Sequence, residues 1–252
     1  MLERGLVRSR SRAQALIMAG KVFVDGVRIE KAGQDITEES TVEIKGPDHP
    51  YVSRGGVKLE SALRTFKIDC KGNIALDIGA STGGFTDCLL QHGAKKVYAL
   101  DVGFGQLDWS LRQDERVVNL ERINVRYIKP GFIPEPLDIV TVDCSFISLK
   151  LVLMGIIPIL SDCTKLICLI KPQFEVEKGE VGKGGVIKDP EKHKKVLRGI
   201  CSFAREQGLT VKGLIPSPIK GPKGNKEFLC YMIKGATDNE RDTEKIIKGA
   251  LL

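Results

Sequence analysis

Four charged residues stand at the ends of apolar or helical segments, where α/β proteins present side chains to a ligand. They are two lysines and two carboxylates: Lys58, Asp143, Lys171 and Glu227. Any one of them alone would be explained as a surface charge, but four at matching positions favour one shared site. A lysine amine accepts a proton only when it is partly neutral; burial or a second cation lowers its pKa, whereas carboxylates raise it. The set therefore suits proton transfer, with Lys171 as the central group.

The two lysines differ in how unusual their positions are. Lys171 closes the wholly apolar segment 166–170, where a lysine is hard to explain as scaffold. Lys58 falls in the first turn of a helix expected to start near Val57, where the helix dipole disfavours a cation. It is therefore either simply exposed or placed there for an anion or a catalytic pair. The charged, glycine-rich segment 175–185 that follows Lys171 is typical of a mobile substrate loop.

A glycine-rich loop follows the apolar segment 74–78. A strand, a turn with few side chains and a helix start make a nucleotide-type binding loop, because the backbone can approach the ligand closely. The candidate cofactor-binding residues here are Asp77, Gly79, Ala80, Ser81, Thr82, Gly83, Gly84 and Phe85. The loop departs from G-x-G-x-x-G and lacks the lysine of a P-loop. The Asp77 carboxylate would repel a pyrophosphate but suits a cationic amino-acid end, which favours S-adenosylmethionine over NAD.

Two further acids end later apolar segments at the same expected edge of the sheet. Asp101 closes the segment 97–101 and suits a bidentate contact with the two hydroxyls of a ribose. Asp143 closes the segment 140–143 and belongs to the cofactor site as well as to the charged set. Trp109 follows the Asp101 segment; it either covers an adenine or packs in the core, and we prefer the core.

Sustained alternation of strands and helices must position these residues. Strands are expected at 74–79, 96–102, 116–121, 137–144, 165–171, 210–216 and 227–234. Helices are expected near 57–67, 83–92, 148–160 and 190–206, with 236–252 as a candidate closing helix. The pattern predicts an α/β fold with a Rossmann-like, doubly wound sheet of seven strands. No helix fits between the last two strands, so the last pair is predicted to be antiparallel.

The first 46 residues differ from the rest of the chain in their residue pattern. Four arginines crowd into one turn and helix start: Arg4, Arg8, Arg10 and Arg12. Two helices and a small sheet are expected here, with a helix at 12–19, a hairpin at Asp25–Gly26 and a strand at 41–45. The arginines either bind an RNA backbone or form a solvated helix face, and RNA binding is the preferred interpretation. We expect an RNA-binding module at 1–46, a linker at 47–56 and a larger domain at 57–252.

Composition limits the function classes. The chain has 252 residues and a net charge of +7, which fits a polyanionic partner or a generically basic surface. Its seven cysteines include no C-x-x-C pair and it has only three histidines, so reduced thiols and no metal site are expected. The most apolar segment, 149–160, is too short to span a bilayer. We see no secretory signal, and we expect a soluble, cytoplasmic protein.

The first 26 residues resemble the S-four-type RNA-binding fold, named after a small-subunit ribosomal protein. The resemblance rests on Gly5-Leu-Val-x-Ser-Arg-x-x-Ala-x-x-Leu-Ile-x-x-Gly-x-Val-x-Val-Asp-Gly26. It implies that arginines near the first loop and helix meet the phosphate backbone. The family pattern begins with a longer first helix than Met1-Leu-Glu3 leaves room for, so the module is expected to be shortened at its start.

Nearly the whole chain resembles the TlyA-type (hemolysin A) family of FtsJ-like ribose 2′-O-methyltransferases of ribosomal RNA. The resemblance rests on Ser53-Arg-Gly-Gly-x-Lys58, Asp77-Ile-Gly-Ala-Ser-Thr-Gly-Gly-Phe-Thr86, Val142-Asp-x-Ser-Phe-Ile-Ser148, Leu169-Ile-Lys-Pro-Gln-Phe-Glu175 and Gly224-Asn-Lys-Glu-Phe228. It implies that the four charged residues form a catalytic tetrad. It also implies that S-adenosylmethionine lies over residues 79–86, with Asp101 on its ribose and Asn124 near its adenine.

The function expected from this resemblance is methyl transfer to a ribose 2′-hydroxyl of ribosomal RNA, with cytidine as the nucleoside and ribosomal subunits as partners. Three alternatives remain at this point. The chain could be a non-catalytic RNA-binding or ribosome-assembly protein, a membrane-lytic hemolysin, or an NAD oxidoreductase. The intact glycine-rich loop and tetrad weigh against the first, and the lack of a membrane-inserting helix weighs against the second.

Overall fold

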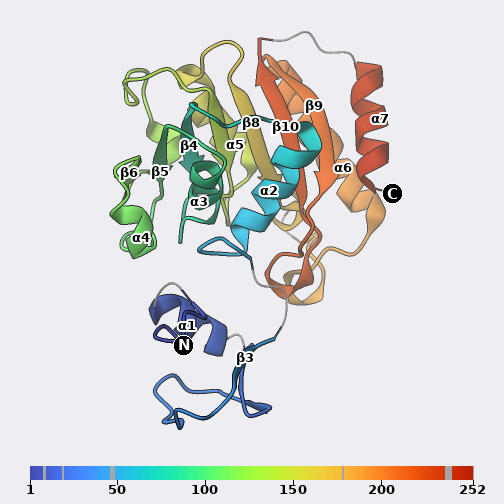
Figure 1. Ribbon diagram of the computed structural model, residues 1–252. Helices are drawn as coiled ribbons and strands as arrows, with labels where there is room; N and C mark the ends of the chain where they lie inside the picture. The colour runs from blue at the N-terminus through green and yellow to red at the C-terminus, as the bar shows by residue number, and fades with distance from the viewer. Residues whose placement is uncertain (8–9, 19, 46–48, 178, 236–239, 252) are drawn as a thin grey trace. The chain divides into compact units, whose positions relative to one another are not determined.

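The computed structural model describes residues 1–252 except 8–9, 19, 46–48, 178, 236–239 and 252 (Figure 1). The chain forms two compact units, Met1–Pro50 and Tyr51–Leu252. The sequence pattern placed a linker at 47–56, but Tyr51 is buried in the core of the second unit. Residues 51–56 are therefore part of that larger unit.

The smaller unit consists of one described helix and a three-stranded antiparallel sheet. Its elements are α1 (Arg10–Met18), β1 (Val22–Val24), β2 (Val27–Arg28) and β3 (Val42–Ile44), with sheet order β2-β1-β3. The predicted hairpin is confirmed: Asp25 and Gly26 both have positive φ, at 49° and 80°, as a tight two-residue turn requires.

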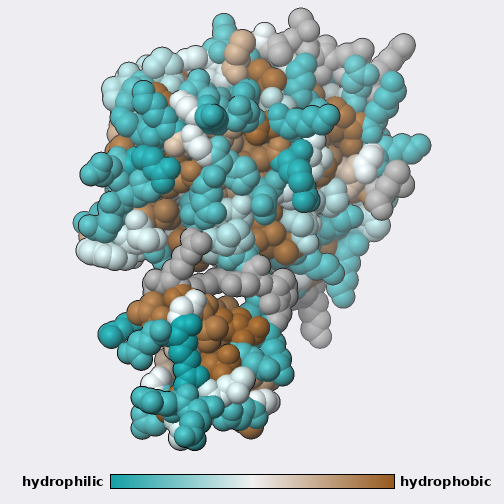
Figure 2. All heavy atoms as spheres, viewed as in Figure 1, coloured by the Kyte–Doolittle hydropathy of each residue, from teal (hydrophilic) through white to brown (hydrophobic). Residues whose placement is uncertain are grey.

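The second helix expected in this unit is not found among its described residues. Residues 2–5 form a turn. Gly5, at its end, adopts a left-handed conformation, which stops a helix. The core is small, with Val7, Leu16, Val22 and Ile29 as its buried members, and Met18 is 83% exposed. Apolar side chains accordingly gather on the visible surface of this unit (Figure 2).

Seven strands form the sheet of the larger unit, as predicted. They are β4 (Ile74–Ile78), β5 (Lys96–Leu100), β6 (Val117–Leu120), β7 (Ile139–Val142), β8 (Lys165–Ile170), β9 (Leu209–Pro216) and β10 (Phe228–Lys234). The order is β6-β5-β4-β7-β8-β10-β9, and β10 is antiparallel to both of its neighbours. The predicted antiparallel last pair is confirmed. The insertion of β10 between β8 and β9 was not foreseen.

Helices cover both faces of this sheet (Figure 1). On one face lie α2 (Gly55–Phe66), α3 (Gly84–Gln91) and the short α4 (Trp109–Arg112). On the other lie α5 (Leu149–Ile156), α6 (Pro190–Glu206) and α7 (Glu240–Leu251). The strands alternate between these layers: in β8, Leu166, Cys168 and Ile170 face α5 and α6, whereas Ile167 and Leu169 face α2 and α3. The doubly wound architecture is therefore confirmed.

Short 3₁₀ helices join several of these elements. They are η1 (Val125–Tyr127), η2 (Ile157–Ile159), η3 (Pro172–Phe174), η4 (Lys183–Gly185) and η5 (Pro222–Gly224). The helix expected at 148–160 ends as α-helix at Ile156 and continues as η2, because Pro158 has no N–H to donate to the preceding turn.

The preferred core position of Trp109 was wrong, since its side chain is 72% exposed. Helix α4 has only four residues, and the one that it buries is Leu111. Trp109 is the first residue of that helix, after Asp108, whose side chain accepts a hydrogen bond from the Ser110 N–H. A single turn buries one side and leaves Trp109 on the other.

The cysteines do not form disulfide bonds. All seven are unbridged, and burial raises the pKa of Cys70 to about 11 and that of Cys144 to about 12. Within the described ranges, no helix combines the length and apolar content needed to cross a membrane.

Candidate active site

The site lies where the order of the sheet reverses direction. Strand β4 pairs with β5 on one side and β7 on the other, and crevices at the carboxyl ends of such strands bind ligands. Two adjoining cavities open there, of about 360 Å³ and about 460 Å³. They share four wall residues: Gly79, Ser81, Asp143 and Ser145. The loops after β4 and β7 thus form the boundary between the two cavities.

The glycine-rich loop is shaped by a close approach to the neighbouring strand. Gly79 has a φ of +80°, and a Cβ there would lie 2.7 Å from the carbonyl oxygen of Asp143. The backbone N–H groups of Gly79 and Ala80 both donate to the Leu100 carbonyl. The loop therefore turns back over the sheet and leads into α3. Gly84, the first residue of α3, borders the first cavity, and this helix start has no side-chain cap. The Thr86 N–H of this first turn is hydrogen-bonded to Asp77, and the helix dipole favours a negatively charged ligand group.

Asp101 is held rigidly at the tip of β5. One carboxylate oxygen accepts the Ser81 N–H at 2.8 Å and the other accepts the Gly103 N–H at 2.7 Å. The side chain borders the second cavity together with Asn124, whose Oδ1 accepts the Arg126 N–H. Each carboxylate oxygen keeps a lone pair for a ligand, so the group can accept hydrogen bonds from two neighbouring hydroxyls.

Asp77 serves this site from beneath the loop. Its side chain is completely buried, and its two oxygens accept hydrogen bonds from the hydroxyls of Thr86, at 2.7 Å, and Thr141, at 2.9 Å. The pKa of Asp77 is raised to about 6, mainly by burial and also by the charge of Asp143, while the hydrogen bonds from Thr86 and Thr141 oppose the rise. Asp77 borders neither of the two cavities described above. It therefore supplies negative potential and holds β4, β7 and α3 together.

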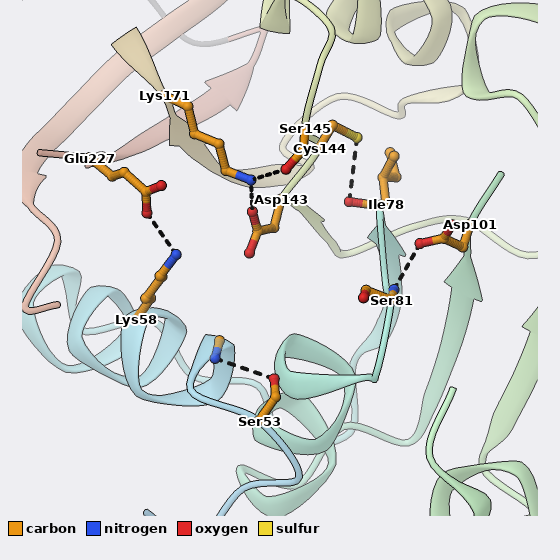
Figure 3. A network of polar contacts seen from close by, with 11 residues as sticks. Ser53, Lys58, Ile78, Ser81, Asp101, Asp143, Cys144, Ser145, Lys171 and Glu227 are labelled. Carbon is orange, nitrogen blue, oxygen red and sulfur yellow. Dashed lines mark hydrogen bonds and ion pairs between the residues drawn. The ribbon is translucent and has the colours of Figure 1, made fainter. Parts of the chain in front are cut away.

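The tetrad residues come together as two ion pairs (Figure 3). Lys58 Nζ, from α2, lies 2.7 Å from Glu227 Oε2, at the start of β10. Lys171 Nζ, after β8, lies 2.6 Å from Asp143 Oδ1, after β7. All four border the first cavity. Of the two earlier possibilities for Lys58, the structure shows a buried pair, because its side chain is only 10% exposed.

Two residues of the loop after β7 went unassigned in the sequence pattern. Ser145 Oγ accepts a hydrogen bond of 2.8 Å from Lys171 Nζ, so this lysine is fixed by two oxygens. Phe146 has a positive φ of 63° and is 91% exposed, beside the second cavity and 5.1 Å from the ring of Phe174. The motif Ser-Phe-Ile-Ser was visible in the sequence, but nothing in it signals which side chain reaches the lysine.

Glu175 holds that loop in place. Its carboxylate accepts hydrogen bonds of 2.7 Å from the Ser148 hydroxyl and the Leu149 N–H, at the start of α5. Burial raises its pKa, which these two hydrogen bonds counteract. The residue was assigned in the sequence to a mobile loop, whereas here it joins the segment after Lys171 to the segment after Asp143.

The arginines of the smaller unit differ in their contacts and exposure. Arg4 donates to the carbonyl oxygens of Thr37, Glu38 and Ser40, so its guanidinium stabilises the loop before β3. Arg10 is exposed at the start of α1. Arg8 and the side chain of Arg12 lie outside the part of the chain that the structure describes.

Comparison with known proteins decides the family. The model of the FtsJ-like methyltransferase family matches residues 51–234, and that of the S4 domain matches residues 1–42. The chain belongs to the FtsJ-like methyltransferases. The FtsJ-like match contains all seven strands of the large sheet and all four tetrad residues.

Relatives of this FtsJ-like chain carry two kinds of name. Hemolysin A of Brachyspira hyodysenteriae is 46% identical over 91% of this chain and 95% of its own length. The 16S/23S rRNA (cytidine-2′-O)-methyltransferase TlyA of Mycobacterium tuberculosis is 44% identical over 92% of this chain and 87% of its own. A solved structure named after the hemolysins, from Streptococcus thermophilus, superposes with a TM-score of 0.79 at 42% identity. It covers 98% of this chain and 92% of its own.

Proposed function

We propose that this protein transfers a methyl group from S-adenosylmethionine to the 2′-hydroxyl of a cytidine ribose in ribosomal RNA. The observation that carries the proposal is the Lys171 amine, which Asp143 and Ser145 hold at the wall of the first cavity. The adjoining second cavity contains the Asp101 carboxylate, which can accept hydrogen bonds from two neighbouring hydroxyls. The name of the Mycobacterium tuberculosis relative, a 16S/23S rRNA (cytidine-2′-O)-methyltransferase, supports this choice of substrate. The proposal places the enzyme in the cytoplasm, with ribosomal subunits as its partners.

The residues fit S-adenosylmethionine. Asp101 would accept the two ribose hydroxyls, and the apolar walls around Asn124, among them Ile123 and Ile147, would take the adenine. Gly79 lines both cavities, and its close approach to the Asp143 backbone excludes a side chain at this position. The uncapped start of α3 suits the carboxylate of the methionine end, and the buried Asp77 charge suits its cations. When bound, the cofactor supplies a methyl group on a positively charged sulfur.

The tetrad prepares the acceptor oxygen. A ribose hydroxyl is a weak acid, so it must lose its proton as its oxygen attacks the methyl carbon. We assign the uptake of that proton to Lys171 Nζ, while the methyl carbon leaves its sulfur, and the Asp143 Oδ1 atom at 2.6 Å would stabilise the resulting ammonium. The Lys58–Glu227 pair, at the opposite side of the same cavity, positions the ribose. Glu227 Oε1 is buried without a partner among the described residues and can accept a hydroxyl hydrogen bond.

Recognition of the RNA falls to several parts of the chain. The S4-type module is proposed to dock RNA, through Arg8, Arg10 and Arg12, with Arg4 holding the loop before β3. The exposed Phe146 ring at the edge of the second cavity can stack on a nucleobase.

The test is transfer of tritiated methyl from S-adenosylmethionine to each purified ribosomal subunit, followed by nucleoside analysis for 2′-O-methylcytidine. We expect label in ribosomal RNA with the wild type. Lys171→Ala should lower the rate at least about 100-fold, while calorimetry shows unchanged cofactor binding. Full activity of this variant would contradict the role of Lys171, and no label from the wild type would contradict the function.

The alternatives make opposite predictions in the same set of assays. A non-catalytic assembly protein would bind ribosomal RNA but show no calorimetric signal with S-adenosylmethionine. A lytic protein would release haemoglobin from erythrocytes when added free of detergent. An NAD oxidoreductase would exchange hydride with a nicotinamide cofactor. We expect none of these three results.

A further inference from the structure

A third cavity, of about 640 Å³, borders the tetrad on the side away from the cofactor loop. One wall is formed by residues 186–188 and by His193 of α6, and the other by residues 217–220, 223, 224, 226 and 227 before β10. It shares Ile219, Lys220 and Glu227 with the first cavity, whereas it shares no wall residue with the second. A chain-like ligand lying in it would therefore lead directly to the catalytic residues.

The cavity is strongly basic. Four lysines border it: Lys188, Lys220, Lys223 and Lys226. Within the described part of the chain none of them forms an ion pair, and Glu227, the carboxylate in the wall, is already paired with Lys58. Lys188, Lys220 and Lys223 are exposed, and Lys226 lies over the Phe228 ring at 5.5 Å. Unpaired lysines along one groove are the signature of a phosphate backbone partner.

The walls are fixed to each other before any ligand binds. Asn225 is 3% exposed, and its amide bridges the two segments. Its Oδ1 accepts the Ile187 N–H at 3.0 Å, and its Nδ2 donates to the Gly185 carbonyl at 2.9 Å. The cavity is thus preorganised, because one buried side chain sets the spacing of its two sides.

His193 adds an acceptor to this basic surface. The side chain is only 5% exposed, stacks edge-on to Phe228, and borders the cavity with a buried Nε2 that has no partner among the described residues. Burial is the largest of the causes that lower its pKa, which favours the neutral form of the ring. Its hydrogen bond to the backbone of Ile187 involves the carbonyl, since the Ile187 N–H is given to Asn225. The proton is therefore on Nδ1, and Nε2 is left as an acceptor.

We propose that this cavity holds the ribose-phosphate unit of a nucleotide next to the acceptor, with the lysines on its phosphates and His193 Nε2 accepting its 2′-hydroxyl. The inference rests on the proposed function, because it names how the RNA strand reaches that site. A 2′-hydroxyl is the group that distinguishes RNA from DNA, so His193 makes the enzyme select RNA. A phosphate alone would satisfy the lysines but would leave Nε2 unpaired.

The lysines are tested by a triple variant of the full chain, K188Q/K223Q/K226Q, which leaves the shared Lys220 in place. The matched control is K194Q/K245Q/K248Q, which removes the same charge from positions of α6 and α7 that do not border the cavity. The probe is a fluorescent mixed-sequence oligoribonucleotide, titrated at several salt concentrations. We expect the triple variant to bind about 10- to 100-fold more weakly and its salt slope to fall by about 2, since three phosphate contacts are lost. Equal behaviour of variant and control would overturn the proposal.

His193 is tested by comparing that oligoribonucleotide with its 2′-deoxy counterpart. H193F keeps a ring against Phe228 but removes Nε2. We expect H193F to bind the ribonucleotide about 5- to 10-fold more weakly than the wild type does and the deoxy strand equally well. A merely structural histidine would weaken both, and that result would overturn its assignment. A thermal unfolding scan of H193F excludes a folding defect as the cause.

Methyl transfer to ribosomal subunits separates this inference from the function on which it rests. If the wild type labels ribosomal RNA and the lysine variant has the wild-type KM for the subunits, the function stands and the inference falls. If the wild type labels none but the lysine variant still loses oligoribonucleotide binding, the function falls and the cavity remains an RNA site.

Discussion

Lys58 Nζ and Glu227 Oε2 lie 2.7 Å apart although 169 residues separate them in the chain. The carboxylate side chain is fully buried and that of the lysine is 10% exposed, so each neutralises a charge that has little contact with water. The pair joins α2, at the beginning of the larger unit, to β10, near its end. The contact that links these two parts of the fold therefore also forms part of the wall of the first cavity.

Breaking this pair from one side should destabilise the fold. In Lys58→Met the buried Glu227 charge has lost its partner, which costs roughly 3–5 kcal/mol of unfolding free energy. In Lys58→Met/Glu227→Gln the charge is gone as well, and most of that loss should be recovered, with no recovery of methyl transfer. Urea unfolding measures both. The exposed Arg198–Glu244 pair is the control, since its removal in the same way should change stability far less. A double variant no more stable than Lys58→Met would contradict this account.

Loss of the Asp101 carboxylate should act on cofactor binding. Asp101→Ala removes a charged acceptor of two hydroxyl hydrogen bonds, so the Kd for S-adenosylmethionine should rise about 10- to 100-fold. Isothermal calorimetry gives the number. Asp108→Ala is the control, because this aspartate caps α4 and borders neither cofactor cavity. If the two variants bound the cofactor equally well, Asp101 would have no part in the cofactor site.

Cofactor affinity should rise with pH around the pKa of Asp77, about 6. Below that pH the buried carboxyl is protonated, and a cationic ligand nearby favours the charged form, so binding releases a proton. The affinity should therefore increase by up to about tenfold per pH unit from pH 5 to 6 and level off above 7. Calorimetry in buffers of different ionisation enthalpy measures how many protons are released when the cofactor binds. Asp77→Asn should show a flat profile, and an equally steep profile in that variant would assign the proton to another group.

The raised pKa of Asp77 also determines how the stability of the cofactor-free protein changes with pH. The folded-state pKa of Asp77 is raised from an ordinary value of 3.8, so the stability that it contributes is complete below pH 4 and is lost as the pH rises through 6. The loss amounts to about 3 kcal/mol for a shift of this size. Asp77→Asn, which cannot ionise, should not show this step between pH 4 and 7.

Gly221→Ala should misplace Glu227. A Cβ at Gly221 would lie 2.1 Å from Glu227 Oε1, so the carboxylate must move away from its position beside the first cavity. We expect kcat to fall at least about 10-fold with little change in cofactor affinity. Gly199→Ala is the control: it lies inside α6 with its nearest neighbour atom 3.8 Å away, and should stabilise the helix by about 1 kcal/mol. Unchanged kcat in Gly221→Ala would show that Glu227 tolerates displacement.

The elements were predictable because their patterns are local. The strand ending at Ile170 is a wholly apolar run closed by Lys171 and Pro172, and the structure ends the strand there. The Asp25–Gly26 turn follows from residues that tolerate positive φ. That Asp143 and Lys171 would share one edge also followed from strand ends, since parallel strands finish together.

Contacts between distant segments were not predictable from such patterns. The Lys58–Glu227 pair depends on β10 lying beside β8, and the Lys171–Asp143 pair depends on β7 lying beside β8. No local pattern in the sequence indicates that β10 pairs with β8. Ser145 and Glu175 act through single hydrogen bonds whose partners are fixed only by the folded loops. Trp109 was assigned to the core by its side-chain type, whereas one short helical turn leaves it exposed.

The place of β10 has a consequence for synthesis of the enzyme on a ribosome. This strand is the last to be translated, yet it lies inside the sheet, between β8 and β9, and Glu227 immediately precedes it. A nascent chain that has emerged only as far as β9 has no interior partner for β8 and no acid for Lys58. The sheet can therefore close around β8, and Lys58 can pair with Glu227, only after residues 227–234 have been synthesised.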